Sequence, residues 1–131
     1  RESEAERTLR DGLAALPNDA TLHHALGLSL ARSGRPAEAV AALKRAADLS
    51  DAPRYAYAYA VALHSSGKAN DAIAVLERAR TRHPRDRDLL FALATFHRDA
   101  GRRSRALEYA EQLQQYYPDD PEAAALVRSL R

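Results

Sequence analysis

The stretch LARSGRPAEAV, residues 30–40, decides the fold of this chain because it returns twice in altered form, as LHSSGKANDAI at 63–73 and HRDAGRRSRAL at 97–107. The glycines of the three copies are 33 and 34 residues apart, and an alanine follows each glycine five positions later. These residues are Gly34, Gly67 and Gly101, with Ala39, Ala72 and Ala106. A fixed period of this length is typical of proteins built from supersecondary units that stack on one another. The sequence therefore predicts a solenoid.

Prolines recur in the same register and mark the second boundary of each unit. They are Pro17, Pro84 and Pro118, with Asp51 where a fourth would fall, and aspartates follow at Asp19, Asp86 and Asp120. Glycine allows a tight reversal after a helix, proline ends a helix, and aspartate is a preferred N-cap of the next one. Each unit is therefore interpreted as a pair of helices, A and B. We expect no strand, and helices near 3–15, 20–33, 36–50, 53–66, 69–82, 87–100, 103–116 and 121–130.

The segment RYAYAYAVAL is the one place where the pattern suggests a strand, because Tyr55, Tyr57 and Tyr59 alternate with alanines. Helical periodicity surrounds it, and on a helix Tyr55 and Tyr59 share a face while Tyr57 points the other way. Tyr59 is in phase with Leu26 and Leu93, which are apolar positions of helix A in the neighbouring units. We therefore expect Tyr59 in the core and Tyr57 on the opposite face.

Length and composition limit the kinds of protein that this chain can be. At 131 residues it is one domain, and its 29 alanines favour helices and allow them to approach closely. Because it has no cysteine, it has no disulfide and no thiolate metal site within these residues. There is no apolar run near the roughly 18 residues that a membrane span needs, and no leader of the signal-peptide type. We expect a soluble chain, from the cytoplasm or the periplasm.

No group of residues has the pattern of a catalytic or cofactor site. The histidines lack an HExxH or other ligand spacing, and no glycine-rich loop follows a strand. His23 and His97 fall at core phases, where a partly buried, hydrogen-bonded histidine is the simpler interpretation. The acidic pairs lie at helix starts, where capping explains them. We expect no enzymatic activity, no cofactor and no metal.

A helix pair of 34 residues with a small residue in helix A, glycine at the turn, an alanine early in helix B and proline at the end resembles the tetratricopeptide repeat. The best match lies in HHALGLSLARSGRPAEAVAALKRAADLSD, and its matching residues are Leu26, Gly27, Leu30, Gly34, Ala39, Leu43 and Ala46. The third unit departs from the family pattern at His97, Ala110 and Leu113, so its packing is expected to differ. The resemblance implies an all-α, right-handed α-solenoid of TPR-like repeats.

In that frame the chain is a single repeat domain with five parts. Residues 1–19 hold the orphan helix B of an incomplete repeat, complete repeats cover 20–52, 53–86 and 87–120, and a capping helix occupies 121–131. Because each unit buries its apolar stripe only against neighbours, an orphan helix B leaves that stripe partly uncovered. We therefore expect further repeats or another domain ahead of this segment in the parent protein.

The resemblance implies a non-catalytic role in protein–protein interaction, as a scaffold or adaptor that holds a peptide or helix. In the family the A helices line the concave wall of the superhelix, and partners bind there. The residues of this chain at the groove positions are His24, Leu28, Arg54, Tyr57, Val61, His64, Asp88, Phe91, Thr95 and Arg98. Aromatic and aliphatic side chains with flanking charges suit a modest peptide groove, although Tyr57 and Phe91 could instead pack against each other. Only Arg54 fits the clamp with which some family members hold a carboxylate, so that use is not expected.

Two other modes of action remain open. The first is self-association through the uncovered face of the helix at 3–15, around Leu9 and Leu13. The second is binding of RNA or another polyanion by Arg78–Arg105, a segment with nine arginines against three aspartates. Those arginines gather near two corners between helices rather than along one stripe, so nucleic acid is the less favoured partner.

Overall fold

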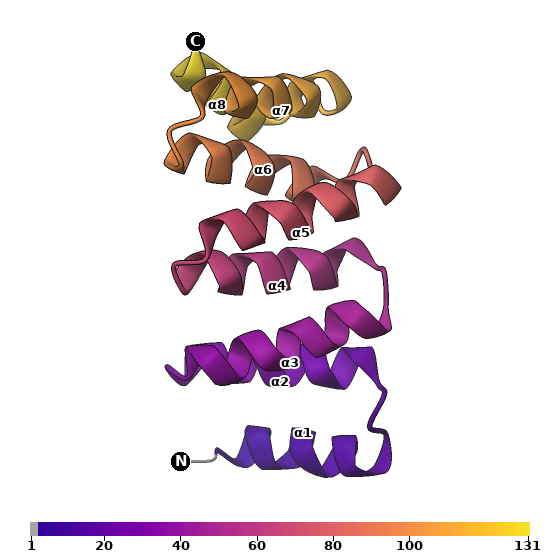
Figure 1. Cartoon of the computed structure of the whole chain (residues 1–131). Helices are drawn as coiled ribbons and strands as arrows, with labels where there is room; N and C mark the ends of the chain where they lie inside the picture. The colour runs from indigo at the N-terminus through magenta and orange to yellow at the C-terminus, as the bar shows by residue number, and fades with distance from the viewer. Residues whose placement is uncertain (1–2) are drawn as a thin grey trace.

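The computed structural model describes residues 3–131, and this part of the chain forms eight helices and no strand (Figure 1). The helices are α1 (Glu4–Ala15), α2 (Ala20–Arg32), α3 (Pro36–Leu49), α4 (Pro53–Ser65), α5 (Ala69–Arg82), α6 (Arg87–Asp99), α7 (Arg103–Tyr116) and α8 (Pro121–Leu130). Each begins and ends within one residue of the predicted boundaries. The first two residues of the predicted 1–19 segment lie outside the described part. None of the helices within residues 3–131 is long and apolar enough to cross a bilayer.

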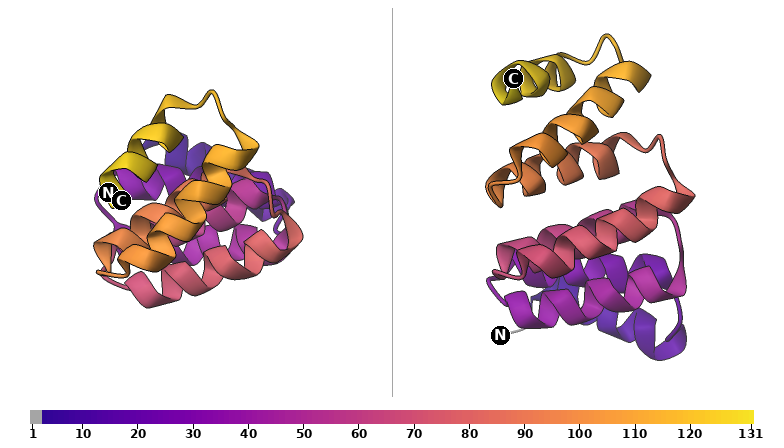
Figure 2. Two further views of the ribbon diagram at one scale, coloured as in Figure 1. Left: turned by 90° about the horizontal axis from the view of Figure 1, so that it is seen from above. Right: turned by 45° about the horizontal axis from the view of Figure 1, so that its top comes forward.

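The helices stack in chain order along the long axis of the molecule, from α1 at one end to α8 at the other (Figures 1 and 2). The most extensive contacts are those of α2 with α3, α4 with α5 and α6 with α7. Each pair continues into the next through contacts of α3 with α4 and of α5 with α6. At the ends, α1 packs against α2, and α8 packs against α7. This arrangement is the predicted all-α solenoid.

Six of the eight helices in residues 3–131 have one of two kinds of start. Helices α2, α6 and α8 begin at aspartates whose carboxylates accept hydrogen bonds from backbone N–H groups at 3.0, 3.0 and 2.9 Å. These are the predicted N-caps Asp19, Asp86 and Asp120. The B helices α3, α5 and α7 have no side-chain cap and follow the turn glycines instead. The φ angles of those glycines are 73°, 83° and 80°, a left-handed conformation that glycine adopts without steric strain.

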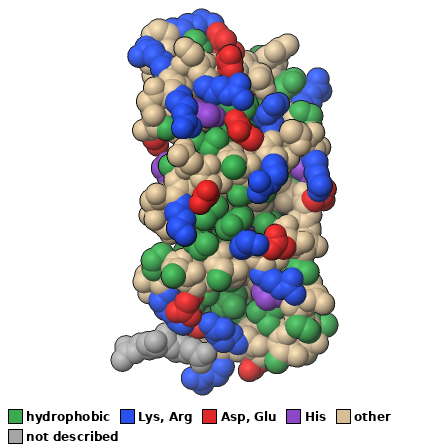
Figure 3. Space-filling model, in the orientation of Figure 1, with side chains coloured by type: hydrophobic (Ala, Val, Ile, Leu, Met, Phe, Trp, Pro, Cys, Tyr) green, Lys and Arg blue, Asp and Glu red, His purple; other side chains and the backbone are tan. Residues whose placement is uncertain are grey.

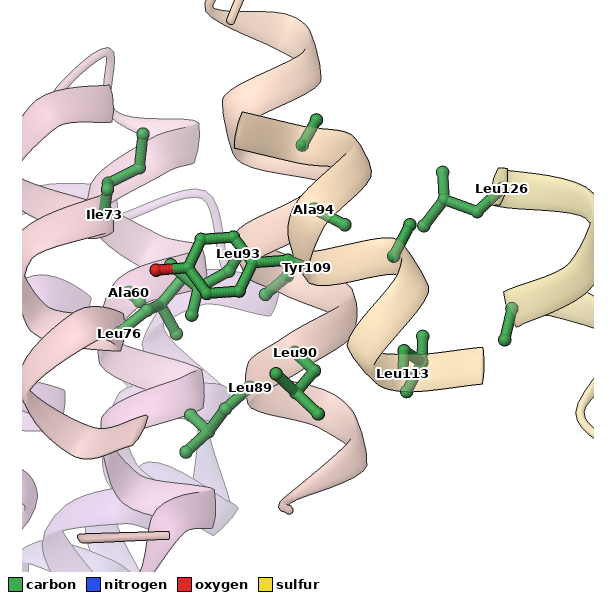
Figure 4. Packing of buried hydrophobic residues seen from close by; sticks show 14 of the residues in the cluster. Ala60, Ile73, Leu76, Leu89, Leu90, Leu93, Ala94, Tyr109, Leu113 and Leu126 are labelled. Atoms are coloured by element: carbon green, nitrogen blue, oxygen red, sulfur yellow. The ribbon is translucent and has the colours of Figure 1, made fainter. Parts of the chain in front are cut away.

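Most of the buried apolar side chains form two clusters. The larger cluster extends from α4 to α8, and Figure 4 shows part of it, with Leu76 and Leu93 among the labelled side chains. The smaller cluster belongs to α2 and α3 and consists of Leu26, Leu30 and Ala39, with Leu9 and Leu13 of α1 packed against it. The stack therefore has a large apolar core toward its C-terminal end and a small one toward its N-terminal end.

The third repeat is tightly packed despite its departures from the family pattern. Ala110 and Leu113 are each 0% exposed and His97 is 4% exposed. The imidazole of His97 stacks on the ring of Tyr109, with centroids 5.6 Å apart and planes 16° apart. Ala110 and Leu113 lie three residues apart on one face of α7, so the larger side chain at one position offsets the smaller one at the other.

The tyrosines of α4 are placed differently from the prediction in one respect. Tyr55 is the buried ring, at 3% exposure, and its hydroxyl lies 3.1 Å from Thr21 Oγ1. Tyr59 packs against the larger cluster but is only half-buried, and it lines a pocket of about 320 Å³ between α3, α4 and α5. A tyrosine ring is longer than the leucines in the same phase, so its end extends past the core. Tyr57 is half-buried as well.

Candidate interaction surface

The A helices form one wall of the stack. α2 contacts α4, and α4 contacts α6, although a B helix separates each pair in the chain. Within the described residues, no two successive B helices make contacts of that extent. Helices on the inside of a curved stack lie closer together than those outside, so the A helices line the inner face.

All ten predicted groove residues lie on these three helices. Five are exposed, namely Leu28, Arg54, Val61, Asp88 and Arg98. Five are half-buried, namely His24, Tyr57, His64, Phe91 and Thr95. The structure brings them together in two groups, one between α2 and α4 and one between α4 and α6.

The first group surrounds an apolar pocket of about 360 Å³ between α2, α3 and α4. Leu28, Tyr57 and Val61 form its rim, and Leu28 and Val61 are 37% and 36% exposed. The remaining lining residues are Ala31, Pro36, Ala39, Leu43, Ala58, Ala62, Ser65 and Ser66. Helix α3 contributes Pro36, Ala39 and Leu43, and the sequence prediction missed this contribution because it considered the A helices alone.

One end of this group is built around Tyr55. Arg54 donates a hydrogen bond from Nη2 to the Tyr55 hydroxyl at 2.7 Å, and its guanidinium lies 4.5 Å from the centroid of that ring. The edge of the His24 ring meets Tyr55 at a centroid distance of 5.1 Å. Burial and the charge of Arg54 lower the pKa of His24 below its usual value. The lowered pKa favours the neutral form of the His24 imidazole. The exposed guanidinium of Arg54 is then the positive charge beside it.

The second group is held by contacts between repeats. His64 of α4 stacks on Phe96 of α6, with centroids 4.0 Å apart and planes 12° apart, and its Nε2 lies 4.0 Å from Asp99 Oδ2. Asp99 also lies 3.1 Å from Arg98 Nη2. The sequence prediction did not include Phe96, although an apolar residue at that phase of helix A was a usable signal. His64 thus contributes to the α4–α6 contact.

Phe91 and Tyr57 both pack against the larger core cluster from the inner wall. The guanidinium of Arg87 lies 5.4 Å from the Phe91 centroid. Among the ring contacts of the described residues, none joins Phe91 to Tyr57. Burial and the nearby Asp88 carboxylate raise the pKa of Tyr57. Thr95 uses its hydroxyl to donate to the Ala92 carbonyl at 3.2 Å, which is an internal contact of α6.

The arginines of Arg78–Arg105 do not form a basic stripe. Arg80 and Arg105 lie over the Tyr109 ring, and Arg105 pairs with Glu77 at 3.3 Å. Arg87 pairs with two carboxylates of α8, and Arg103 donates to backbone carbonyls at the end of that helix. On the face drawn in Figure 3, the Lys and Arg side chains are scattered among acidic and apolar ones. On that face there is no continuous cationic path of the kind along which a nucleic-acid backbone binds.

Helix α1 is fastened to the first repeat by a buried charge. Glu6 is 1% exposed, and its carboxylate oxygens lie 2.6 Å from Arg35 Nη1 and 3.0 Å from Arg10 Nε. Burial would raise the pKa of Glu6, but the two arginines hold it below its usual value. No sequence pattern indicated this ion pair, because Glu6 occupies the phase of Val40 and Ile73, which are apolar.

The two histidines expected at core phases have different surroundings. His23 is half-buried, and its Nε2 lies 2.8 Å from the Pro17 carbonyl oxygen. His97 lies 3.5 Å from Glu77 Oε2 through Nε2. Within residues 3–131 no group of three or more histidine, aspartate and glutamate side chains is arranged to hold a metal ion.

Comparisons with known structures place this fold among helical repeat proteins. A crystal structure of MamA superposes with a TM-score of 0.84 at 22% identity, over 95% of this chain and 74% of that one. PilF of Pseudomonas aeruginosa superposes with a TM-score of 0.83 at 22% identity, over 93% and 56% of the two chains. YrrB, described as a TPR protein with an unusual peptide-binding site, gives 0.82 at 19% identity, over 94% and 64%. At these identities the likeness concerns the fold.

Family comparisons by sequence cover nearly the whole chain. No curated protein matched it. One tetratricopeptide repeat model matches residues 63–130, and a second matches residues 3–56 and again 24–87. These matches agree with the stacked helix pairs, the turn glycines and the period of the sequence. The chain therefore belongs to the tetratricopeptide repeat family.

Proposed function

We propose that this chain is a non-catalytic interaction module that binds a peptide or a helix of another protein on its inner wall. The family and the fold support a protein–protein interaction scaffold in general. The observation that carries the choice of surface is the apolar pocket of about 360 Å³ rimmed by Leu28, Tyr57 and Val61. Leu28 and Val61 are two of the few large apolar side chains that the described residues leave exposed. Exposed apolar side chains around a concavity are a common mark of a binding surface.

The remaining groove residues have supporting roles in this proposal. His24 and Arg54 lie at one end of the first group through their contacts with Tyr55, beyond the residues that line the pocket. Phe91, Thr95, Asp88 and Arg98 of α6 extend the wall beyond α4, and His64 joins the two repeats through Phe96. A partner longer than the pocket would reach this second group.

The test is a pull-down with two surface variants of matched chemistry. Leu28→Glu combined with Val61→Glu places carboxylates at the rim, and both sites are exposed enough for the fold to tolerate the change. Leu16→Glu, at a residue 57% exposed and outside the pocket, is the control for a similar loss of apolar surface. We expect a specific partner to be retained by the parent chain and by Leu16→Glu and to be lost by the double variant. Retention by all three, with equal helicity by circular dichroism, would contradict binding on the inner wall.

A second candidate is self-association through α1, and one structural observation favours it. Ala5, Leu9 and Gly12 are in phase with Ala39, Leu43 and Ala46, which are 1%, 2% and 0% exposed. In α1 the same positions are exposed or only half-buried, because within residues 3–131 no helix precedes α1 to cover them, although Leu9 packs in part against the cluster of α2 and α3. Ala5→Glu should lower the apparent mass in light scattering at high concentration if this face joins two copies. A monomer at all concentrations of the unchanged protein would remove the candidate.

A further inference from the structure

The two helices that rim the apolar pocket carry positive charge and no negative charge. Neither α2, ATLHHALGLSLAR, nor α4, PRYAYAYAVALHS, contains an aspartate or a glutamate. Each contains one arginine, Arg32 at the end of α2 and Arg54 at the start of α4. In a chain with 18 acidic residues among 131, two consecutive A helices without any are a distinct feature of this wall.

We propose that the pocket between α2 and α4 takes the apolar side chain of an acidic peptide segment, with carboxylates of that segment on Arg32 and Arg54. The inference rests on the proposed function and names the class of partner. It follows from charge complementarity, because an acidic segment meets cations at both ends of the pocket and no like charge on α2 or α4.

The two arginines are placed on the same face as the pocket rim. Arg32 follows Leu28 by four residues, and Arg54 precedes Tyr57 by three, and both spacings keep side chains on one side of a helix. Both arginines are exposed. Arg32 makes no hydrogen bond or ion pair with the described residues, and Arg54 uses one nitrogen on the Tyr55 hydroxyl. Their guanidinium groups are therefore available for a bidentate contact with a carboxylate.

Several carboxylates on the neighbouring helices lie beside cations. On α6, Asp88 lies 3.5 Å from Arg87 and Asp99 lies 3.1 Å from Arg98. On α3, Glu38 lies 2.8 Å from Arg35. These pairs reduce the negative field at the pocket, although Asp88 still lies close enough to Tyr57 to raise the pKa of its hydroxyl. Arg32 and Arg54 are the exposed cations of α2 and α4 that an incoming segment meets.

The dimensions of the site suit a short segment. Helix α4 has 13 residues, and at about 1.5 Å per residue it is roughly 20 Å long. An extended peptide covers that length with about six residues, since each residue spans about 3.3 Å. Apart from the hydroxyls of Tyr57, Ser65 and Ser66, the residues that line the pocket offer no hydrogen-bonding side chain, so an apolar residue suits its interior. A segment with an acidic residue on each side of one apolar residue would therefore place its apolar side chain in the pocket and its carboxylates on Arg32 and Arg54.

The first experiment is a selection from a phage-displayed library of random nonapeptides against the whole chain, with the Leu28→Glu/Val61→Glu variant selected in parallel. We expect peptides with leucine, isoleucine or phenylalanine between acidic residues, enriched on the parent chain alone. Basic or neutral peptides enriched on the parent chain alone would overturn the inference and leave the inner wall as the binding surface. No enrichment above the double variant would overturn it as well. In either case the function proposed above is judged by the separate pull-down. That function fails together with the present inference only if the partner in the pull-down is also retained by the Leu28→Glu/Val61→Glu variant.

The second experiment measures the selected peptide by fluorescence anisotropy against charge variants. Arg32→Glu and Arg54→Glu should each weaken binding by about tenfold or more, and Arg32→Lys, which keeps the charge, should weaken it less. Arg128→Glu is the matched control, since Arg128 is exposed on α8 and changes the net charge equally. Raising the salt from about 0.1 M to about 1 M shortens the Debye length from about 10 Å to about 3 Å and should weaken binding further. Equal losses for Arg128→Glu and Arg32→Glu would refute a local contact.

Discussion

At the scale of the residue, Gly27 sets the distance between the two helices of the first repeat. A Cβ built on Gly27 would lie 2.5 Å from Cγ and Cδ2 of Leu43, which is itself 2% exposed. The second and third repeats have alanine at this position, at Ala60 and Ala94. The pair α2 and α3 makes the most extensive contacts of the stack, as expected where a missing methyl group allows the closest approach.

Gly27→Ala is expected to destabilise the protein although alanine is the better helix former. Overpacking of a core costs about 1–3 kcal/mol, and the gain in helix propensity returns up to about 1 kcal/mol. The net loss in the free energy of unfolding, measured in urea, should be about 1–2 kcal/mol. In a Leu43→Ala background the same substitution should be neutral or stabilising. A stabilising effect in the parent chain would show that Leu43 moves aside without cost.

His97 and Glu77 form a second site where single residues affect the stability of the protein, here through its dependence on pH. His97 takes the place of Leu30 and Leu63 in the earlier repeats, and burial lowers its pKa, while Glu77 partly opposes this. Burial alone would raise the pKa of Glu77, but hydrogen bonds from Tyr109 and Arg105 lower it. Both groups therefore bind protons more weakly in the folded protein than in the unfolded chain, so each removes stability as the pH falls.

We expect the free energy of unfolding to fall on acidification in two separate ranges of pH. The loss from His97 begins as the pH falls through its unfolded value of about 6.5, and the loss from Glu77 begins below about 4.5. His97→Leu should flatten the dependence of urea stability between about pH 7 and about pH 5. Tyr109→Phe, which keeps the stacked ring and removes one hydrogen bond to Glu77, should retain the decline in that range. A decline unchanged by His97→Leu would assign it to other groups.

At the scale of the element, local signals were sufficient to predict the helices and insufficient to predict how deeply their side chains are buried. Glycine at a positive φ and aspartate at an N-cap act within one turn, so their spacing located each helix to within one residue. The deeper burial of Tyr55 than of Tyr59 depends on contacts with another repeat, where the His24 ring packs against Tyr55 and Thr21 lies within hydrogen-bond distance of its hydroxyl. No local pattern carries that information.

The candidate site was predictable to the same degree. The period placed all ten residues on the A helices, but it did not show that Leu28, Tyr57 and Val61 enclose a pocket. That depends on the floor from α3, whose distance from α2 is set by Gly27. The stacking of His64 on Phe96 joins two repeats and follows from their rotation relative to each other, which the sequence does not give directly.

The cap of α6 provides a test of how much a single helix start contributes. The Asp86 carboxylate accepts a hydrogen bond from the Leu89 N–H at 3.0 Å, and loss of such a cap typically costs about 1 kcal/mol. Asp86→Ala should therefore lower the free energy of unfolding by about that amount, and Asp86→Asn should retain most of it. Asp119→Ala, at an exposed aspartate next to the cap of α8, is the control for loss of a carboxylate. Equal effects at the two positions would indicate general electrostatics rather than capping.

At the scale of the whole molecule, the two apolar clusters predict that parts of the stack differ in stability. Repeat proteins gain stability from contacts between neighbouring units, so a region with a small core can open while the rest stays folded. The cluster of α2 and α3 contains Leu26, Leu30 and Ala39, whereas the cluster from α4 to α8 contains most of the fully buried side chains. The α2–α4 pocket lies next to the boundary between the two, so a bound segment would also hold them together.

Hydrogen exchange of two core variants would show whether the stack unfolds in parts. Leu30 is 2% exposed and Leu93 is 0% exposed, and truncation of such a leucine to alanine costs about 2–5 kcal/mol. Leu30→Ala should speed exchange in α1, α2 and α3 and leave α6 and α7 protected. Leu93→Ala should speed exchange throughout α4–α8, because that cluster spans those helices. If both variants accelerate exchange equally along the whole chain, the stack is one cooperative unit, and the contacts of α3 with α4 are as strong as those within each repeat.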